Sequence, residues 1–192
     1  MSSNARRNHT MNPMTTPDTE LMAAVRAGDA DCEAAFRELY RRHADRVYRY
    51  ALKVVNGDAR AADILQDTFM KFLVVLRNGE LIENVPAFLM RICRNLCLDL
   101  RRNERMDFID PQLITLTTED ESLEDRDLQE HLSAAIASLP DHYREALVMH
   151  VYGGLSYAEI CEATESSLPM VRNRISRARQ WLRSALLPLF RN

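Results

Sequence analysis

Apolar residues recur at steps of three and four along most of this chain, and this spacing limits its fold more than any other feature. The pattern is clear in residues 36–55, 58–76, 84–106 and 168–187. A period near 3.6 is typical of amphipathic α-helices, whereas a half-buried strand alternates with a period of two. The 192 residues include only 5 Gly and 7 Pro, too few for a turn-rich β architecture. The sequence therefore predicts an all-α fold.

Turn and linker signals divide these helices into two sets. Glycine-containing turns close the first three helices, and a fourth helix starts at Asn84 and Pro86. Residues 107–125 are rich in acids and Thr and lack an apolar stripe, which is typical of a flexible linker. We therefore predict two small helical domains joined by a flexible acidic linker, with these boundaries: a disordered tail at 1–16, a first domain at 17–106, the linker at 107–125 and a second domain at 126–192.

The last two helices have the lengths and the short turn of a helix-turn-helix. Ser156 and Glu159 predict a capping box that opens the first of them. On the second helix, the apolar Leu168, Val171, Ile175, Ala178 and Leu182 share one side. Polar side chains that hydrogen-bond base edges and phosphates gather on the opposite side: Arg172, Asn173, Ser176, Arg177, Gln180 and Arg183. This arrangement favours a recognition helix over an ordinary solvated Arg-rich face.

Charge is strongly segregated, although the net charge is only −3. Residues 166–192 hold six arginines and no acid, while residues 107–130 hold nine acids and one arginine. A basic end joined to a solvated acidic segment is typical of a DNA-reading protein. The fourth helix also carries a basic face, which suits a DNA backbone: Arg91, Arg94, Asn95, Leu98, Arg102 and Arg105.

Other functional classes find little support in the sequence. No Gly-rich phosphate loop, Ser/His/Asp arrangement or metal-spaced cluster is present, so we expect no enzyme activity, no cofactor, no metal and no small-molecule substrate. Cys93 and Cys97 lie one helical turn apart, and burial as small apolar residues is favoured over a metal or redox role. No apolar run reaches the length of a membrane span and the N-terminus lacks a signal-peptide core, so we expect a cytoplasmic protein without membrane insertion.

Three segments in order resemble one family. They are DARAADILQDTFMKFLVVL (58–76), AFLMRICRNLCLDLRRNER (87–105) and LPDHYREALVMHVYGGLSYAEICEATESSLPMVRNRISRARQWLR (139–183). Together they resemble the extracytoplasmic-function (ECF) branch of bacterial RNA polymerase sigma factors. The likeness covers residues 18–106 and 126–187, and the last segment is the most specific.

The resemblance implies a role for each helical surface. Core RNA polymerase would dock on the third helix through Asp63, Gln66, Asp67, Phe69 and Phe72, although burial in the core is the alternative for one of the two Phe rings. The −10 promoter element would meet the loop 78–84 and Arg91, Asn95, Asp99 and Arg102. The −35 element would be read by Arg172, Asn173, Arg174, Ser176 and Arg177. The resemblance further implies an anti-sigma factor that covers these surfaces until a stimulus arrives.

The chain departs from the family pattern at several positions. Glu165 and Ser166 stand in the helix-turn-helix turn, where the family usually has Gly and an apolar residue. A non-Gly residue there must adopt left-handed geometry, at a cost of about 1 kcal/mol. Phe88 replaces the usual Trp, and the loop 78–84 matches poorly. We therefore predict the fold and the surfaces, but not the base identities at −10.

One competing function is a stand-alone helix-turn-helix transcriptional regulator with a dimerisation or sensing domain. It explains the C-terminal helices equally well, but not the polar third helix or the basic fourth helix. A regulator of that kind binds its duplex site tightly on its own, whereas a sigma factor needs core polymerase.

Overall fold

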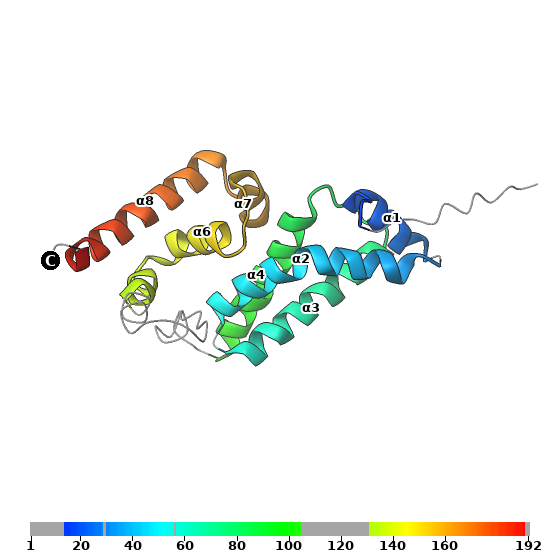
Figure 1. The fold of residues 1–192 in the computed structure, drawn as a ribbon, viewed down its shortest axis with the longest axis horizontal. Coiled ribbons are helices and arrows are strands. Elements are labelled where there is room, and N and C mark those ends of the chain that lie inside the picture. Colours follow the sequence, from blue (N-terminus) through cyan, green and yellow to red (C-terminus); the bar gives the residue numbers. More distant parts are fainter. Residues whose placement is uncertain (1–13, 29, 56, 105–130, 191–192) are drawn as a thin grey trace, which may run out of the picture.

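The computed structural model describes residues 14–28, 30–55, 57–104 and 131–190, and every regular element in these ranges is a helix (Figure 1). The N-terminal bundle contains α1 (Asp18–Ala27), α2 (Cys32–Val54), α3 (Asp58–Arg77) and α4 (Val85–Glu104). The C-terminal bundle contains helical residues 131–137, α6 (Asp141–Val151), α7 (Tyr157–Thr164), α8 (Leu168–Leu186) and the 3-10 helix η2 (Leu187–Phe190). The all-α prediction is confirmed. The predicted linker and nearly all of the predicted tail lie outside the described residues.

Turn residues end the helices close to where the sequence predicts. Gly28 adopts the left-handed conformation (φ 64°) and its N–H donates to the carbonyl of Ala24, which closes α1. Pro17 occupies the N-cap position of α1 with extended backbone (ψ 152°), so the helix begins at Asp18.

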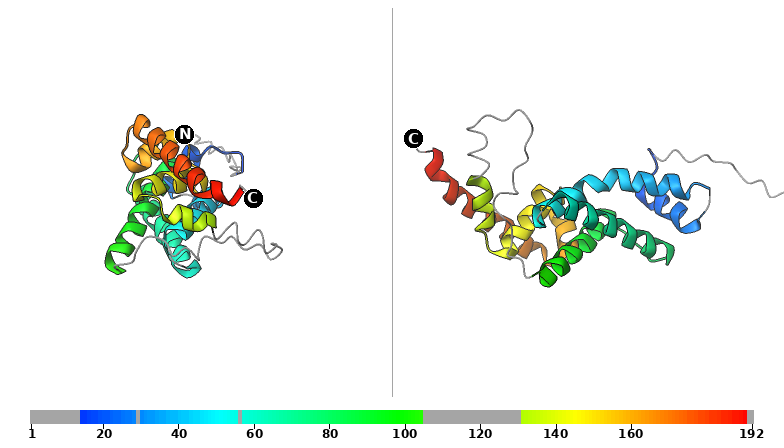
Figure 2. Two further views of the ribbon diagram at one scale, coloured as in Figure 1. Left: turned by 90° about the vertical axis from the view of Figure 1, so that its left-hand side faces the viewer. Right: turned by 90° about the horizontal axis from the view of Figure 1, so that it is seen from below.

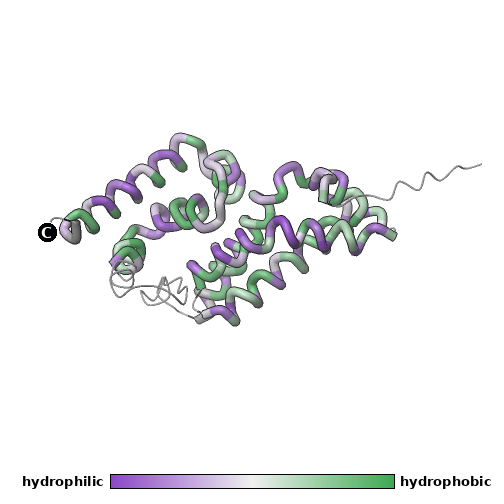
Figure 3. Tube along the Cα trace, viewed as in Figure 1, coloured by the Kyte–Doolittle hydropathy of each residue, from purple (hydrophilic) through white to green (hydrophobic). Residues whose placement is uncertain are grey.

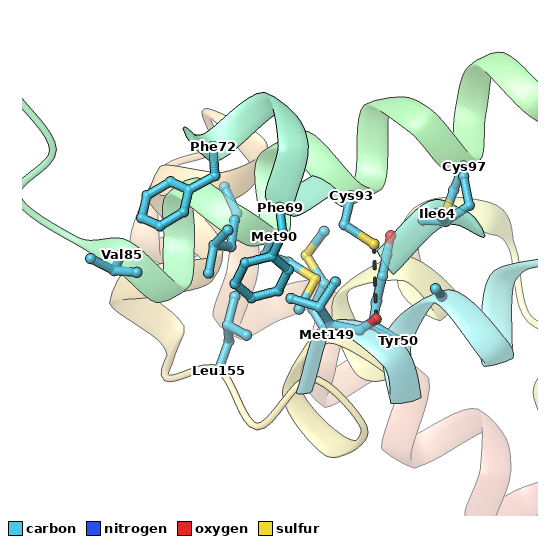
Figure 4. Close-up of a cluster of buried hydrophobic side chains, with 14 of the residues drawn as sticks. Tyr50, Ile64, Phe69, Phe72, Val85, Met90, Cys93, Cys97, Met149 and Leu155 are labelled. Atoms are coloured by element: carbon cyan, nitrogen blue, oxygen red, sulfur yellow. Dashed lines mark hydrogen bonds between the residues drawn. The ribbon is translucent and has the colours of Figure 1, made fainter. Parts of the chain in front are cut away.

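The apolar stripes of α2, α3 and α4 meet in one core that continues into the C-terminal bundle. Leu39, Phe72 and Leu89 have no exposed surface. Met149 and Leu155 of the C-terminal bundle reach the same cluster, close to Met90 of α4 (Figure 4). The two bundles therefore share buried surface, and α7 packs against α4. Figures 1 and 2 show the C-terminal bundle beside the N-terminal one.

A polar network fastens α1 to α2. Nε2 of His43 lies 2.7 Å from Oδ2 of Asp18, and Arg42 donates to Oδ1 of Asp18 at 2.7 Å and to Oε1 of Glu38 at 2.7 Å. Arg41 donates to the other oxygen of Glu38 at 2.8 Å. The hydrogen bond with His43 is the main reason that the pKa of Asp18 is lowered. Charged side chains that pair in this way lose their favourable contacts when a carboxylate is protonated.

Acid should destabilise the chain partly through Glu38. Hydrogen bonds from Arg41 and Arg42 lower the pKa of Glu38 from 4.5 to about 2. Because the folded-state pKa is the lower one, the stabilisation is complete above pH 4.5 and is lost as the pH falls towards 2. We expect the melting temperature, followed by circular dichroism, to fall over this range and to fall less steeply in Glu38→Gln. The control Glu33→Gln, which removes an exposed ion pair with Arg37, should keep the steep decline.

Arg144 organises the start of the C-terminal bundle from a buried position, with only 5% of its surface exposed. Its guanidinium donates to the carbonyl oxygens of Ile136 (3.1 Å), Ala137 (2.6 Å) and Leu139 (2.5 Å). These carbonyls lie at the C-terminal end of helical residues 131–137 and just beyond it, where helix hydrogen bonds run out. A positive charge also complements the negative end of that helix.

Candidate nucleic-acid interface

The helix-turn-helix is built by α7, a short turn and α8. The predicted capping box is present: Glu159 N–H donates to Oγ of Ser156 at 3.2 Å, and Ser156 N–H donates to Oε2 of Glu159 at 2.7 Å. Glu165 closes α7 in the left-handed conformation (φ 53°, ψ 37°), as the sequence required of a non-Gly residue at this turn. The N–H of Ser166 then donates to the carbonyl of Cys161 at 3.0 Å, which fixes the turn into α8.

One face of α8 is buried and the other is open to solvent. Val171, Ile175 and Ala178 are at most 1% exposed. Hydrophilic residues, drawn as purple segments of the tube, recur along this helix (Figure 3). Four of the five residues predicted to read the −35 element are exposed on it: Arg172, Asn173, Ser176 and Arg177. Their exposure leaves them available to a major groove.

Arg174 differs from its four neighbours. It is half-buried, and its Nη1 donates to Oγ of Ser166 at 3.1 Å. This bond joins α8 to the turn, so in this structure Arg174 holds the helix-turn-helix together instead of facing outwards. Leu168, predicted on the apolar side, is 39% exposed at the first residue of α8.

The residues predicted to bind core polymerase fall into two groups on α3. Asp63, Gln66 and Asp67 are exposed. Phe69 and Phe72 are 3% and 0% exposed, and their rings pack edge-to-face with centroids 6.3 Å apart. Burial thus applies to both rings, where the sequence suggested it for one. Direct contact of either ring with a partner does not fit this structure. Both rings pack in the core, on the side of α3 opposite its exposed residues.

The basic face of α4 is divided by the C-terminal bundle. Asn95, Asp99 and Arg102 are exposed, and Asp99 lies 3.9 Å from Arg102. Arg91 is half-buried and its guanidinium lies 5.1 Å from the ring centroid of Phe88. Arg94, on the same side of the helix as Arg91, contacts the C-terminal bundle.

The partner of Arg94 is Glu145 of α6, at 2.6 Å. The two side chains are only 27% and 16% exposed. Partial burial lowers the pKa of Arg94, but hydrogen bonding to Glu145 and the charges of Glu145 and, more weakly, Tyr50 and Glu165 raise it overall. The guanidinium is therefore firmly charged and paired.

Two further contacts that the sequence analysis missed join the bundles. The ammonium of Lys53 in α2 lies 5.0 Å from the ring centroid of Tyr152, just after α6. Gly153 packs so tightly that a Cβ there would lie 2.9 Å from Cε of Met90. No periodicity or spacing marks these contacts, because they join residues far apart in sequence.

Cys93 and Cys97 are both fully buried. The Cys93 thiol donates weakly to the carbonyl of Val47 at 3.9 Å (Figure 4), and its pKa is raised by its neighbour Cys97 and by burial. A protonated, enclosed thiol is unreactive. Within the described residues, no three His, Cys, Asp or Glu side chains gather closely enough to hold a metal ion, and no helix is long and apolar enough to cross a membrane.

An outward-facing recognition helix, set on a helical bundle beside a second bundle with its own basic helix, defines a helix-turn-helix DNA-binding protein. Two family models match the same two regions. Sigma-70 region 2 matches residues 39–106, and Sigma-70, region 4 matches residues 129–182.

Characterised relatives narrow this class further. The ECF RNA polymerase sigma factor SigE of Mycolicibacterium smegmatis is 36% identical over 166 residues, covering 83% of this chain, while the chain spans 64% of that relative's length. The RNA polymerase sigma factor CarQ of Myxococcus xanthus is 32% identical over 155 residues, covering 79% of this chain and 89% of the relative. The chain belongs to the ECF family of RNA polymerase sigma factors.

Solved structures agree with this assignment. CnrH, solved in complex with the cytosolic domain of CnrY, is 25% identical with a TM-score of 0.64, covering 90% of this chain and 98% of that one. The sigma factor RpoE of Bartonella quintana, solved with the anti-sigma factor NepR, is also 25% identical, with a TM-score of 0.63, covering 79% of this chain and 96% of that one.

Proposed function

We propose that this chain binds core RNA polymerase in the cytoplasm and directs it to promoters, without catalysing a reaction itself. The observation that carries the proposal is the pairing of an exposed recognition face on α8 with a second bundle of the sigma-70 region 2 type. A simple regulator needs only the first of these. We propose the domain boundaries that the sequence predicts, 17–106 and 126–192.

In this proposal each of three surfaces binds one partner. Asp63, Gln66 and Asp67 on α3 dock core polymerase. Asn95, Asp99 and Arg102 with Arg91 on α4 meet the −10 element. The −35 element is read as a duplex by the exposed face of α8: Arg172, Asn173, Ser176 and Arg177.

An anti-sigma factor is the third proposed partner. The chain covers nearly the whole of CnrH and of the Bartonella quintana RpoE, and the latter was solved with an anti-sigma factor. The exposed apolar side chains Met70 and Val74 on α3, each 54% exposed, lie beside the docking residues and offer such a partner apolar contact.

Core polymerase should be required for tight promoter binding. A single recognition helix on one chain contacts only a few base pairs, so the free chain should bind promoter duplex weakly at physiological salt. Addition of core should give sequence-specific binding and run-off transcription on a promoter library. Nanomolar, sequence-specific binding by the free chain would instead support the stand-alone regulator.

The double variant Gln66→Ala, Asp67→Ala sharpens this experiment. Both side chains are exposed, so the fold should persist while co-migration with core on size exclusion and the transcript yield both fall. The matched control is Glu33→Ala, Arg37→Ala, which removes two exposed side chains that form an ion pair on α2. Full co-migration of the α3 variant would show that core docks elsewhere.

A further inference from the structure

The first turn of α8 is apolar and open to solvent, unlike the polar face that follows it. Leu168, Pro169 and Met170 are the first three residues of the helix, and all three are exposed. Leu168 is 39% exposed and Met170 is 48% exposed. Single exposed apolar side chains are common on protein surfaces, whereas three in succession at the start of a recognition helix form a continuous apolar surface.

Met170 lies in line with residues proposed to read the −35 element. It precedes Asn173 by three positions and Arg177 by seven, so the three side chains follow one edge of the exposed face. Val171 beside it is completely buried, so α8 cannot rotate to cover Met170 without exposing its own core. Met170 therefore belongs to the exposed face of the helix.

The backbone of this turn is held in place. Nη1 of Arg174, one turn beyond Met170, donates to Oγ of Ser166 just before the helix. Pro169 restricts the backbone further, because its ring locks φ. The side chain of Met170 is unbranched and polarizable, so it can adapt its shape to a partner while its backbone stays fixed.

The chemistry of the major groove limits what this turn can contact. The N-terminal residues of a recognition helix contact the base edges. Those edges present hydrogen-bond donors and acceptors, and the apolar group among them is the 5-methyl group of thymine. The thioether of Met170 has no donor and is only a weak acceptor, so its favourable contact with a base edge is with that methyl group. No acidic residue of α8 repels the DNA that would bring the methyl group close.

We propose that Met170 contacts the 5-methyl group of a thymine in the duplex read by α8, and so adds a preference for thymine at one position. Leu168 and Pro169 extend the apolar surface around this contact. Asn173 suits adenine through hydrogen bonds, and every A·T pair also carries a thymine, so the two side chains favour the same base pairs. The inference rests on the proposed reading of DNA by α8, but not on the need for core polymerase.

Deoxyuridine tests this contact, because it differs from thymine only by the missing 5-methyl group and keeps the same pairing. The probes are the duplexes that holoenzyme selects from a promoter library, or that the free chain selects from random duplexes, with each thymine replaced in turn. Competition binding should show about fourfold weaker binding of the wild type at one thymine, the loss expected for one buried methyl group. Met170→Ala should bind the thymine and deoxyuridine probes alike at that position.

Two further variants separate a methyl contact from a general effect on α8. Met170→Leu keeps a large apolar side chain and should keep much of the preference for thymine over deoxyuridine. Leu187→Ala removes another exposed apolar side chain, 52% exposed and just beyond the other end of α8, and should keep the wild-type preference. Equal losses in the wild type and in Met170→Ala, or no loss at any thymine in the wild type, would overturn the proposal.

Failure of this contact and failure of the proposed function give different results. If the holoenzyme reads the −35 element through Arg172 and Arg177 while every deoxyuridine probe binds as well as its thymine parent, the proposed function stands and the thymine contact is wrong. If only the free chain selects a duplex and Met170→Ala abolishes its thymine preference, the contact stands and the proposed need for core polymerase is wrong.

Discussion

Replacing Arg172 or Arg177 with Ala should weaken holoenzyme binding to its promoter by about 1–3 kcal/mol and relax the base preference at one position of the −35 element. Both side chains are exposed, and Val171, Ile175 and Ala178 fill the opposite side of α8. Truncation should therefore leave the bundle intact, and the loss should come from a missing contact to a base edge. Competition binding of holoenzyme to a set of −35 variants measures both the affinity and the preference.

Arg179 and Arg183 provide the contrast within the same helix. Both are exposed nearer the C-terminal end of α8, where phosphate contact is expected. Their replacement should weaken every sequence alike and reduce the salt dependence of binding by about one unit for each lost phosphate contact. If Arg172→Ala and Arg177→Ala both left −35 preference and promoter affinity unchanged, α8 would carry a solvated basic face and another element would read the promoter.

Replacing Arg144 with Met should destabilise the C-terminal bundle by about 3–5 kcal/mol, because a buried guanidinium leaves polar partners behind when it is removed. The carbonyls of Ile136, Ala137 and Leu139 would lose their charged donor in a region closed to water. Trp181 is the single tryptophan of the chain, and its Nε1 donates to Oγ of Ser138, next to these carbonyls. Its fluorescence during denaturant unfolding therefore reports on this part of the bundle.

Arg179→Met makes the same chemical change at an exposed position of α8 and serves as the control. Its stability should stay within about 0.5 kcal/mol of the wild type. A similarly small effect of Arg144→Met would mean that water or a rearranged backbone satisfies the three carbonyls.

The periodicity of apolar residues was sufficient to predict the helices, because the apolar pattern of each helix can be read from its own stretch of sequence. The stripe of α8 correctly separated buried Val171 and Ile175 from exposed Arg172. The capping box at Ser156 and the left-handed Glu165 were also visible in the sequence, since both are local features of one turn. Hydrogen bonding within a few residues is what makes such features readable.

Features that depend on tertiary packing could not be predicted in this way. Phe69 and Phe72 lie on a helix with exposed neighbouring residues. Both rings are buried only because α2 and α4 pack against this helix. Arg94 and Glu145 are 51 positions apart, and nothing in either segment pairs them. Arg174 has the same chemistry as Arg172 and Arg177, yet the position of Ser166 turns it towards the protein.

Met90, Met149 and Leu155 pack in one core. A substitution at one of these positions therefore changes the packing of both bundles. A Cβ at Gly153 would lie 2.6 Å from the carbonyl oxygen of Met149 and 2.9 Å from Cε of Met90, so a smaller residue at position 90 alone would not make room for a side chain there. A helix-turn-helix transplanted from a distant relative would bring its own version of this shared packing and meet an α4 shaped for another partner. Chimeras between family members should therefore work best when α4 and the C-terminal bundle are exchanged together.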